Sequence, residues 1–253
     1  MKNNAITLEN ITKRFPVYDE HLTANRQAHG GFFYALEDVS LVIKSGMCVI
    51  IAGANGSGKS LLMSIIAGLE EPTSGTVNVA GKTGLVFQEP DAQILGETVR
   101  EDTAFGPANS GISKKEIKAL VDSALEQTGL SGREEFPARS LSGGEKRRLA
   151  AAGVLAMNAD IIIFDEPYAN LDYPGIVQVN GLFKKLIAGE KTLLILTHEL
   201  EKCLSLADQF IVLFQGKKVF DGTAAQALSL NLEEWGIHHP LSNCACELGA
   251  LLW

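Results

Sequence analysis

A glycine-rich run of eight residues constrains the fold more than any other part of the sequence: Gly53-Ala54-Asn55-Gly56-Ser57-Gly58-Lys59-Ser60. The apolar residues 49–52 precede it and the helix-forming residues 61–66 follow it, so it joins a buried strand to a helix. Glycines let the backbone wrap around a polyphosphate, with N–H groups and the positive helix end turned toward it. A plain glycine-rich turn is the alternative, but the flanking strand and helix favour a binding site for a nucleoside triphosphate.

Two further positions give this loop its chemistry. Lys59 is placed to reach the β- and γ-phosphates, and the Ser60 hydroxyl is placed to ligate Mg²⁺.

Residues 160–167 form a second key segment, an apolar strand that ends in Asp165 and Glu166. We expect Asp165 to hold Mg²⁺ through water and Glu166 to polarise the water that attacks the γ-phosphate. A strand that merely ends in solvated acids is the alternative, and the upstream loop disfavours it.

Composition excludes several classes of protein. The chain has 253 residues, 46% of them hydrophobic, which is enough for a large buried core. The net charge of −8 argues against nucleic acid or an anionic lipid surface as the main partner. Four cysteines are too few for a disulfide scaffold, and no apolar run reaches the ~18 residues of a membrane span. We expect a reducing, cytosolic setting with no direct membrane insertion.

Hydrophobic periodicity divides the chain into an α/β core and a helical lobe. A long polar loop is expected at 16–31, and helical periodicity replaces strand patterns from 89 to 158. Ser113 with Glu116 forms a capping box that starts a helix, and Gly129 ends it. Strands are expected at 5–9, 36–44, 76–79, 83–87, 161–164, 192–196, 209–214 and 218–220, with a helix at 174–188.

A third segment, Leu141-Ser142-Gly143-Gly144-Glu145-Lys146-Arg147-Arg148, completes a recognisable set. Ser-Gly-Gly at a helix start is either a simple cap or a helix N-terminus aimed at a phosphate. The glycine-rich loop, this run and the Asp165-Glu166 strand end occur in the order of the ATP-binding-cassette family, which the chain resembles from about residue 6 to 222. Lys146, Arg147 and Arg148 are expected on the solvated side of the helix.

The resemblance implies a fold and a domain arrangement. The fold is a P-loop NTPase (RecA-like) core sheet with N-terminal antiparallel strands and an inserted α-helical subdomain. The ATPase core is expected at 1–88 and 159–230, the helical subdomain with the signature motif at 89–158, and a C-terminal tail at 231–253.

The resemblance also implies roles for single residues, with ATP and Mg²⁺ as ligands. Gln88, Asp172 and His198 look like the Q-loop, D-loop and switch residues. The expected catalytic residues are Glu166, His198, Lys59 and Gln88, and the expected metal ligands are Ser60, Gln88 and Asp165. The expected nucleotide contacts are Phe15, Gly53, Asn55, Gly56, Ser57, Gly58, Lys59, Ser60, Leu61, Ser142, Gly143, Gly144 and Asp172.

The residue that stacks on adenine is the least defined member of this set. In the family it is an aromatic near the end of the first strand, and Phe15 fits best, with Tyr18 and Tyr34 as rivals. Three positions depart from the family pattern. Glu145 replaces the frequent glutamine of the signature run. Leu61 replaces a hydroxyl residue that would bond the α-phosphate, and Tyr168 replaces the usual threonine or serine.

The branch of the family is indicated by residues 86–94, 101–107 and 151–157, which look like the ATPases of energy-coupling-factor importers for vitamins, cobalt or nickel. That similarity implies a second ABC ATPase subunit and an integral membrane coupling protein docked beside Gln88. The chain would then lie peripherally at the cytoplasmic face of the membrane. A soluble ATPase of the iron–sulfur assembly type and a weakly hydrolysing nucleotide-gated regulator remain alternatives. His238, His239, Cys244 and Cys246 form either a tail without metal or a metal site, and their spacing matches no standard zinc pattern.

Overall fold

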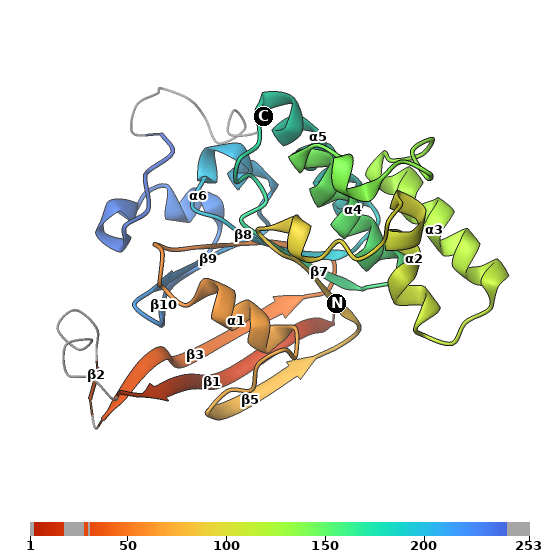
Figure 1. Cartoon of the computed structure of the whole chain (residues 1–253). Coiled ribbons are helices and arrows are strands. Elements are labelled where there is room, and N and C mark those ends of the chain that lie inside the picture. The colour runs from red at the N-terminus through yellow and green to blue at the C-terminus, as the bar shows by residue number, and fades with distance from the viewer. Residues whose placement is uncertain (1–2, 18–27, 30, 242–253) are drawn as a thin grey trace.

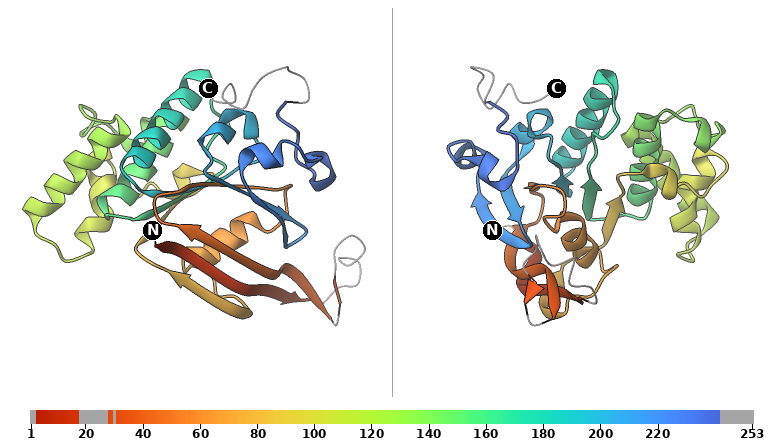
Figure 2. Two further views of the ribbon diagram at one scale, coloured as in Figure 1. Left: turned by 180° about the vertical axis from the view of Figure 1, so that it is seen from behind. Right: turned by 60° about the vertical axis from the view of Figure 1, so that its left-hand side comes forward.

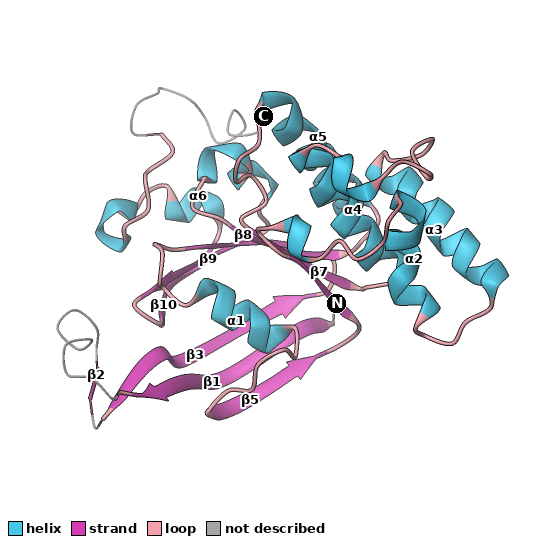
Figure 3. Ribbon diagram, viewed as in Figure 1, coloured by secondary structure: helices cyan, strands magenta, loops and turns pink. Residues whose placement is uncertain are grey.

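Two β-sheets and a set of helices make up the computed structural model, which describes residues 3–17, 28–29 and 31–241 (Figures 1 and 3). The first sheet is antiparallel, with the strand order β2-β3-β1-β5. Its strands are β1 (Asn4–Pro16), β2 (Ala28–His29), β3 (Phe32–Lys44) and β5 (Ser74–Val79). Apolar residues alternate along β1 and β3, so one face of this sheet is buried and the other is open.

The second sheet carries the strand that precedes the glycine-rich loop. Its order is β10-β9-β4-β8-β7-β6, and all neighbours are parallel except β10, which pairs antiparallel with β9. β4 and β8 are buried at every residue, as expected for a parallel sheet that is covered on both faces. The strands are β4 (Cys48–Ala52), β6 (Thr83–Val86), β7 (Ile161–Asp165), β8 (Thr192–Leu196), β9 (Gln209–Phe214) and β10 (Lys217–Gly222).

Helices cover both faces of this parallel sheet. α1 (Lys59–Ile66) lies between the two sheets (Figure 1), where Leu62, Met63 and Ile66 join one buried cluster with side chains of both. A second cluster fills the opposite face. The remaining helices are α2 (Val99–Ala108), α3 (Lys114–Thr128), α4 (Gly143–Ala156), α5 (Tyr173–Ala188) and α6 (Ala224–Ala227), with 3₁₀ turns η2 (Pro90–Ala92), η3 (Ala138–Ser140), η4 (Leu200–Lys202), η5 (Leu204–Leu206) and η6 (Leu232–Trp235).

The segment between β6 and β7 is helical, as the periodicity predicts. Figure 2 shows α2 and α3 grouped on one side of the molecule, with α4 reaching back to the parallel sheet. The capping box at the start of α3 is present, with the Glu116 backbone N–H donating to Ser113 Oγ over 3.3 Å. Gly129 ends the helix at φ 70°, a left-handed conformation that favours glycine. The domain boundaries themselves stay a prediction.

The structure differs from the sequence expectations in three places. The first is that β1 and β3 are longer than predicted, so Pro16 belongs to a strand. The second is that Ala28–His29 form β2 inside the expected loop.

Tyr18, Cys244 and Cys246 lie outside the described residues. His239 lies within them, and both its ring nitrogens are engaged, with Leu228 O at 3.0 Å and with the Leu241 N–H at 3.2 Å.

The third difference concerns the basic run at the start of α4. The prediction of a solvated face is wrong for two of its residues, because Arg147 is 3% exposed and Arg148 is 9% exposed. Both guanidinium groups donate to backbone carbonyls, which is what compensates the burial of their charge. Lys146 instead pairs with Asp91 over 2.6 Å.

Within residues 3–17, 28–29 and 31–241, every helix is too short or too polar to cross a lipid bilayer.

Candidate nucleotide-binding and hydrolysis site

The glycine-rich loop joins β4 to α1 through positions where a side chain does not fit. Gly58, the residue before α1, has φ 100°, and a Cβ atom there would lie 2.7 Å from Leu36 Cδ2. A Cβ atom at Gly53 would lie 2.3 Å from Leu213 O. The loop therefore keeps its path only with glycine at these two positions. It curves around the N-terminal end of α1, where the unpaired N–H groups of the first turn attract anions.

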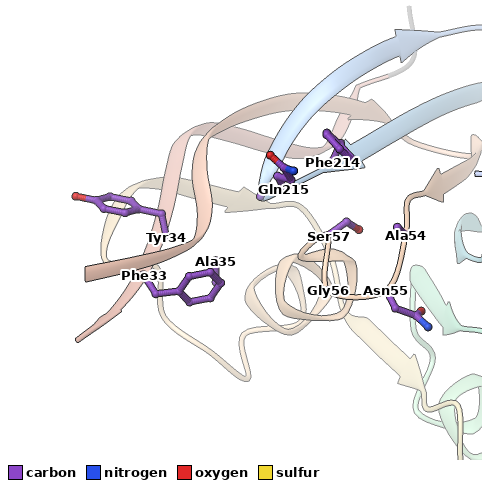
Figure 4. A pocket seen from close by; sticks show the side chains of 10 residues that line it. Phe33, Tyr34, Ala35, Ala54, Asn55, Gly56, Ser57, Phe214 and Gln215 are labelled. Carbon is purple, nitrogen blue, oxygen red and sulfur yellow. The ribbon is translucent and has the colours of Figure 1, made fainter. Parts of the chain in front are cut away.

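Two cavities border this loop. The first, here called the phosphate cavity, has a volume of about 300 Å³ and is lined by residues 55–61 together with Phe33, Ala35, Gln88 and Glu166. The second, here called the base cavity, has about 250 Å³ and is lined by Phe33, Tyr34 and Ala35, by residues 54–57, and by residues 214–216 (Figure 4). The two share Phe33 and the loop, so one elongated ligand can occupy both.

Polar groups of the loop fit a phosphate chain. Lys59 Nζ donates to the loop's own carbonyls, Gly53 O at 2.6 Å and Ala54 O at 3.2 Å. Burial lowers the pKa of Lys59, and the nearby carboxylates of Glu166 and Asp165 oppose this effect. Ser57 Oγ is buried and has no hydrogen-bond partner among the described residues. A buried hydroxyl without a partner is costly unless a ligand satisfies it, which fits phosphate binding at this loop.

The acids at the end of β7 meet the histidine that follows β8. Because β7 and β8 are parallel neighbours, their carboxyl ends lie together, and Glu166 Oε1 lies 3.0 Å from His198 Nδ1. Glu166 is 8% exposed and its φ is 45°, a left-handed conformation that is rare for a non-glycine residue. Its backbone N–H donates to Leu196 O at 2.9 Å. Strain of this kind clusters at functional sites.

The expected metal ligands supply oxygen atoms only. Burial raises the pKa of Asp165, and the neighbouring Ser60 hydroxyl partly offsets this effect. Gln88 borders the phosphate cavity as well. No cluster of three or more His, Cys, Asp or Glu side chains suited to a metal occurs among the described residues. A hydroxyl, an amide and one carboxylate suit Mg²⁺, which takes few protein ligands and shares its shell with phosphates and water.

Of the aromatic residues considered for the adenine contact, Tyr34 borders the base cavity and Phe15 does not. Phe15 borders neither cavity: it pairs with Phe33 across β1 and β3, is 42% exposed, and lies beneath Lys13 Nζ. Figure 4 shows the ring of Phe33 directed toward the loop and the ring of Tyr34 directed away from it. Sequence reasoning did not single out Phe33 or the turn at 214–216, which line these cavities. The aromatic run 32–34 ahead of a strand was the available signal for Phe33.

Tyr168, the departure that follows Pro167, has a structural explanation. Its side chain is buried, and its hydroxyl donates to Asn180 Oδ1 of α5 over 2.7 Å. Asn180 Nδ2 in turn donates to Lys202 O over 2.8 Å. The tyrosine therefore links the segment after Glu166 to the segment after His198 through α5. A threonine would be too short to span this distance.

The Ser-Gly-Gly run borders a separate cavity. Ser142, Gly143 and Gly144 line it together with residues 170–172, and its volume is about 390 Å³. We call it the signature cavity. The Ser142 side chain caps α4 and Asp172 Oδ1 accepts the Gly175 N–H at the start of α5. The signature cavity shares no lining residue with the phosphate cavity, so these predicted nucleotide contacts do not meet the glycine-rich loop within one chain.

Fold and site together define a P-loop nucleoside triphosphatase. A family model described as ABC transporter matches residues 36–169, and the chain belongs to that family as an ATP-binding ATPase. The energy-coupling factor transporter ATP-binding protein EcfA of Methanocaldococcus jannaschii is 38% identical over 209 residues, covering 77% of this chain and 75% of its own. The cobalt import ATP-binding protein CbiO of Rhodobacter capsulatus is 37% identical over 231 residues, which cover 85% of this chain and 82% of CbiO. The EcfA2 protein of Methanospirillum hungatei is 39% identical over 210 residues, and the match spans 77% of this chain but only 53% of that longer protein.

Solved structures agree with the family. The structure of cbiO1 from Clostridium perfringens, described as part of the ABC transporter complex cbiONQ, superposes with a TM-score of 0.78 at 28% identity and covers 90% of this chain and 92% of its own. The dimeric structure of the ABC transporter cassette MJ0796 gives a TM-score of 0.73 at 28% identity, covering 87% and 98%.

Proposed function

We propose that the chain is the ATP-hydrolysing subunit of an importer of the energy-coupling-factor type, taking up a vitamin or the metal ions cobalt or nickel. The naming of relatives as EcfA and CbiO supports the importer branch. The observation that carries the enzymatic part is the 3.0 Å contact between Glu166 and His198 at the rim of the phosphate cavity. In this proposal the chain lies peripherally at the cytoplasmic face, held there by a membrane partner.

The chemistry follows from the groups around the phosphate cavity. The loop N–H groups and Lys59 hold the β- and γ-phosphates, and the Glu166 carboxylate accepts a proton from the attacking water. His198 positions Glu166 through their shared contact and, in this proposal, binds the γ-phosphate. Ser60, Gln88 and Asp165 would hold Mg²⁺, which supplies charge neutralisation between the phosphate oxygens. Phe33 is the proposed adenine platform in place of Phe15.

A pair of chains is needed to complete this site. The signature cavity lies apart from the phosphate cavity, and its α4 N-terminus can approach a phosphate only on another molecule. A head-to-tail pair would place Ser142, Gly143 and Gly144 of one subunit against the nucleotide of the other. The dimeric cassette among the structural neighbours supports this arrangement. The second subunit is either a second copy or a related ABC ATPase.

A groove lined in part by Gln93, from the segment that follows Gln88, supports docking of a membrane partner. It has a volume of about 140 Å³ and lies between the segment after β6, α2 and α4. Three of its lining residues are large, apolar and exposed, namely Leu95 at 61%, Phe105 at 49% and Met157 at 40%. Gln93, also in the lining, binds the Phe87 N–H and Leu85 O. A helix seated here would therefore touch the same segment that carries Gln88, as required for coupling transport to hydrolysis.

The test uses the variant Glu166→Gln, which keeps the shape of the side chain and removes the base. The ATPase rate should fall by about 10²- to 10⁴-fold while ATP binding persists. The tagged variant is purified with ATP in mild detergent from its own cells, and its partners are identified by mass spectrometry. Recovery of a multi-span membrane protein, with or without a second cassette, is the expected result. Recovery of soluble partners alone would contradict the importer, and an unchanged ATPase rate would contradict the role of Glu166.

A further inference from the structure

Arg147 occupies a position that the hydrolytic chemistry described above does not use. It lies in the first turns of α4, and its guanidinium is buried. Its Nη2 donates to Gln88 O at 2.9 Å, and its Nη1 donates to Ala169 O at 3.3 Å. Burial lowers the pKa of Arg147, and the carboxylate of Glu199, next to His198, opposes this effect. One side chain thus binds two segments that border the candidate site and lies in the field of a third.

The two carbonyls that Arg147 binds belong to different cavities. Gln88 borders the phosphate cavity. Ala169 directly precedes Asn170, Leu171 and Asp172, which border the signature cavity. The guanidinium therefore links the backbone that borders the phosphate cavity to the backbone next to the signature cavity. Arg147 belongs to α4, and the N-terminus of α4 also borders the signature cavity.

The energetics favour a role beyond packing. A buried guanidinium loses a large hydration energy, and its Nε has no partner among the described residues. An apolar side chain of similar volume would fill the same space without that loss. What an apolar residue could not do is hold two carbonyls at once in a planar, forked geometry.

We propose that Arg147 is a positioning residue for ATP hydrolysis, holding the Gln88 and Ala169 carbonyls so that the phosphate cavity and the signature cavity keep one relative position. The proposal rests on the ATPase function proposed above. In a head-to-tail pair, each nucleotide touches the phosphate cavity of one subunit and the signature cavity of the other. Arg147 then transmits the position of one nucleotide to the other across its own subunit.

Arg148 provides a matched comparison on the same helix. It is also buried, its Nε also has no partner among the described residues, and its Nη1 donates to two carbonyls, Thr128 O at 3.0 Å and Gly129 O at 3.1 Å. Those carbonyls end α3, away from both cavities. Both arginines are therefore buried and bind two backbone carbonyls, but only Arg147 binds carbonyls of segments that border the candidate site.

The experiment compares Arg147→Met, Arg147→Lys and Arg148→Met in the complex purified from its own cells. Measured are kcat and KM for ATP, the Kd for ATP, and the thermal unfolding midpoint. For Arg147→Met we expect kcat to fall by about tenfold or more with Kd within about twofold, because binding uses the loop of one subunit and hydrolysis uses both cavities. Arg147→Lys can hold one carbonyl, so its kcat should lie between wild type and Arg147→Met.

Arg148→Met should lower the unfolding midpoint and leave kcat of the folded protein within about twofold. The proposal is overturned if Arg147→Met keeps wild-type kcat, or if Arg148→Met loses as much kcat. It is also overturned if both Arg147 variants fail to fold while Arg148→Met folds, because Arg147 would then be a structural residue. A wild-type complex without ATPase activity would instead contradict the proposed function itself.

Discussion

At the residue scale, Glu166, the proposed catalytic base, shows how the fold holds one side chain in one conformation. A left-handed backbone at a non-glycine residue costs on the order of 1–3 kcal/mol, and the surroundings must supply it. Here the Glu166 N–H binds Leu196 O and its carboxylate contacts His198, so two bonds to the β8 segment hold it. The side chain consequently borders the phosphate cavity, and in the proposed reaction this would reduce the reorganisation needed during hydrolysis.

The first prediction distinguishes Phe33 from Phe15. Base stacking on an aromatic side chain is worth about 1–3 kcal/mol, so Phe33→Ala should raise the Kd for ATP by roughly five- to 150-fold. Phe15→Ala is the matched control, because Phe15 borders neither cavity. The Kd of the Phe15→Ala variant for ATP should stay near the wild-type value. Calorimetric titration with ATP measures both. Binding of inorganic triphosphate, which has no base, should be unaffected in either variant.

A greater loss of ATP affinity in Phe15→Ala than in Phe33→Ala would return the adenine contact to Phe15. An equal loss of triphosphate and ATP affinity in Phe33→Ala would indicate damage to the loop rather than loss of stacking.

The sequence predicted the residues of the phosphate loop and the acids after β7 because their chemistry requires particular side chains at fixed local spacing. It did not predict contacts that depend on non-local strand pairing. Irregular register between β1 and β3 decides which aromatic residue faces the loop, and no local pattern reports that register. The burial of Arg147 was missed for the same reason, because its partners Gln88 and Ala169 are distant in sequence.

At the element scale, four of the described helices begin with a capping box, and two of them use serine with glutamate. Ser113 with Glu116 starts α3, and Ser142 with Glu145 starts α4, with backbone N–H to Oγ distances of 3.3 and 3.4 Å. Only the second borders a cavity of the candidate site. The replacement of glutamine by Glu145 in the signature run thus keeps the box closed and adds negative charge at the positive end of α4.

This pair yields the second prediction. Ser113→Ala and Ser142→Ala should each lower the free energy of unfolding by about 1 kcal/mol, measured by urea titration. Only Ser142→Ala should also lower the ATPase rate of the folded protein, because Ser142 is proposed to touch the partner's nucleotide. Equal ATPase rates in the two variants would remove Ser142 from the nucleotide contacts.

The third prediction concerns Asp102 of α2. Its Oδ1 accepts the Leu95 N–H at 2.7 Å and the Gly96 N–H at 3.0 Å, and burial raises its pKa despite these bonds. A raised pKa in the folded state means that the folded protein favours the protonated acid. The stability that Asp102 contributes is therefore largest in acid and is lost as the pH rises through the folded-state pKa. Wild type should therefore gain stability relative to Asp102→Asn as pH falls from about 7 to about 4.

Urea unfolding of both proteins across that range gives the difference directly. A difference that stays constant, or that favours Asp102→Asn more strongly in acid, would contradict the burial of a titrating carboxyl at this position.

Most elements could be predicted from periodicity and caps, since these signals act over a few residues. The helix bounds of α3 and α5 agree with the expected starts and ends to within about two residues. The length of β1 and β3 could not be predicted, because their outer parts pair with each other rather than with the core and show no clean alternation.

At the scale of the whole molecule, the groove formed by the segment after β6, α2 and α4 yields the fourth prediction. Leu95→Asp and Phe105→Asp each place a charge in the proposed docking surface and should abolish co-purification of the membrane partner. Leu69→Asp is the control, since Leu69 is 63% exposed and lies outside the groove. ATP binding should be unchanged in all three, because none borders the phosphate cavity. Retention of the membrane partner by both groove variants would exclude this surface as the dock.

The strand order of the parallel sheet has a consequence for the order in which the protein is synthesised. β4, which leads into the glycine-rich loop, pairs only with β8 and β9, as in Cys48 with Leu193 and Val49 with Gln209. The turn after β9 then adds Gly216, whose N–H donates to Ser57 O and whose carbonyl accepts the Glu37 N–H. At about 5–20 residues per second, a ribosome needs on the order of 10 s to add the missing strands. During that interval the nascent chain already contains the complete glycine-rich loop, but the cavity that the loop will border has not formed. Both edges of the apolar strand β4 stay unpaired until β8 and β9 have been synthesised.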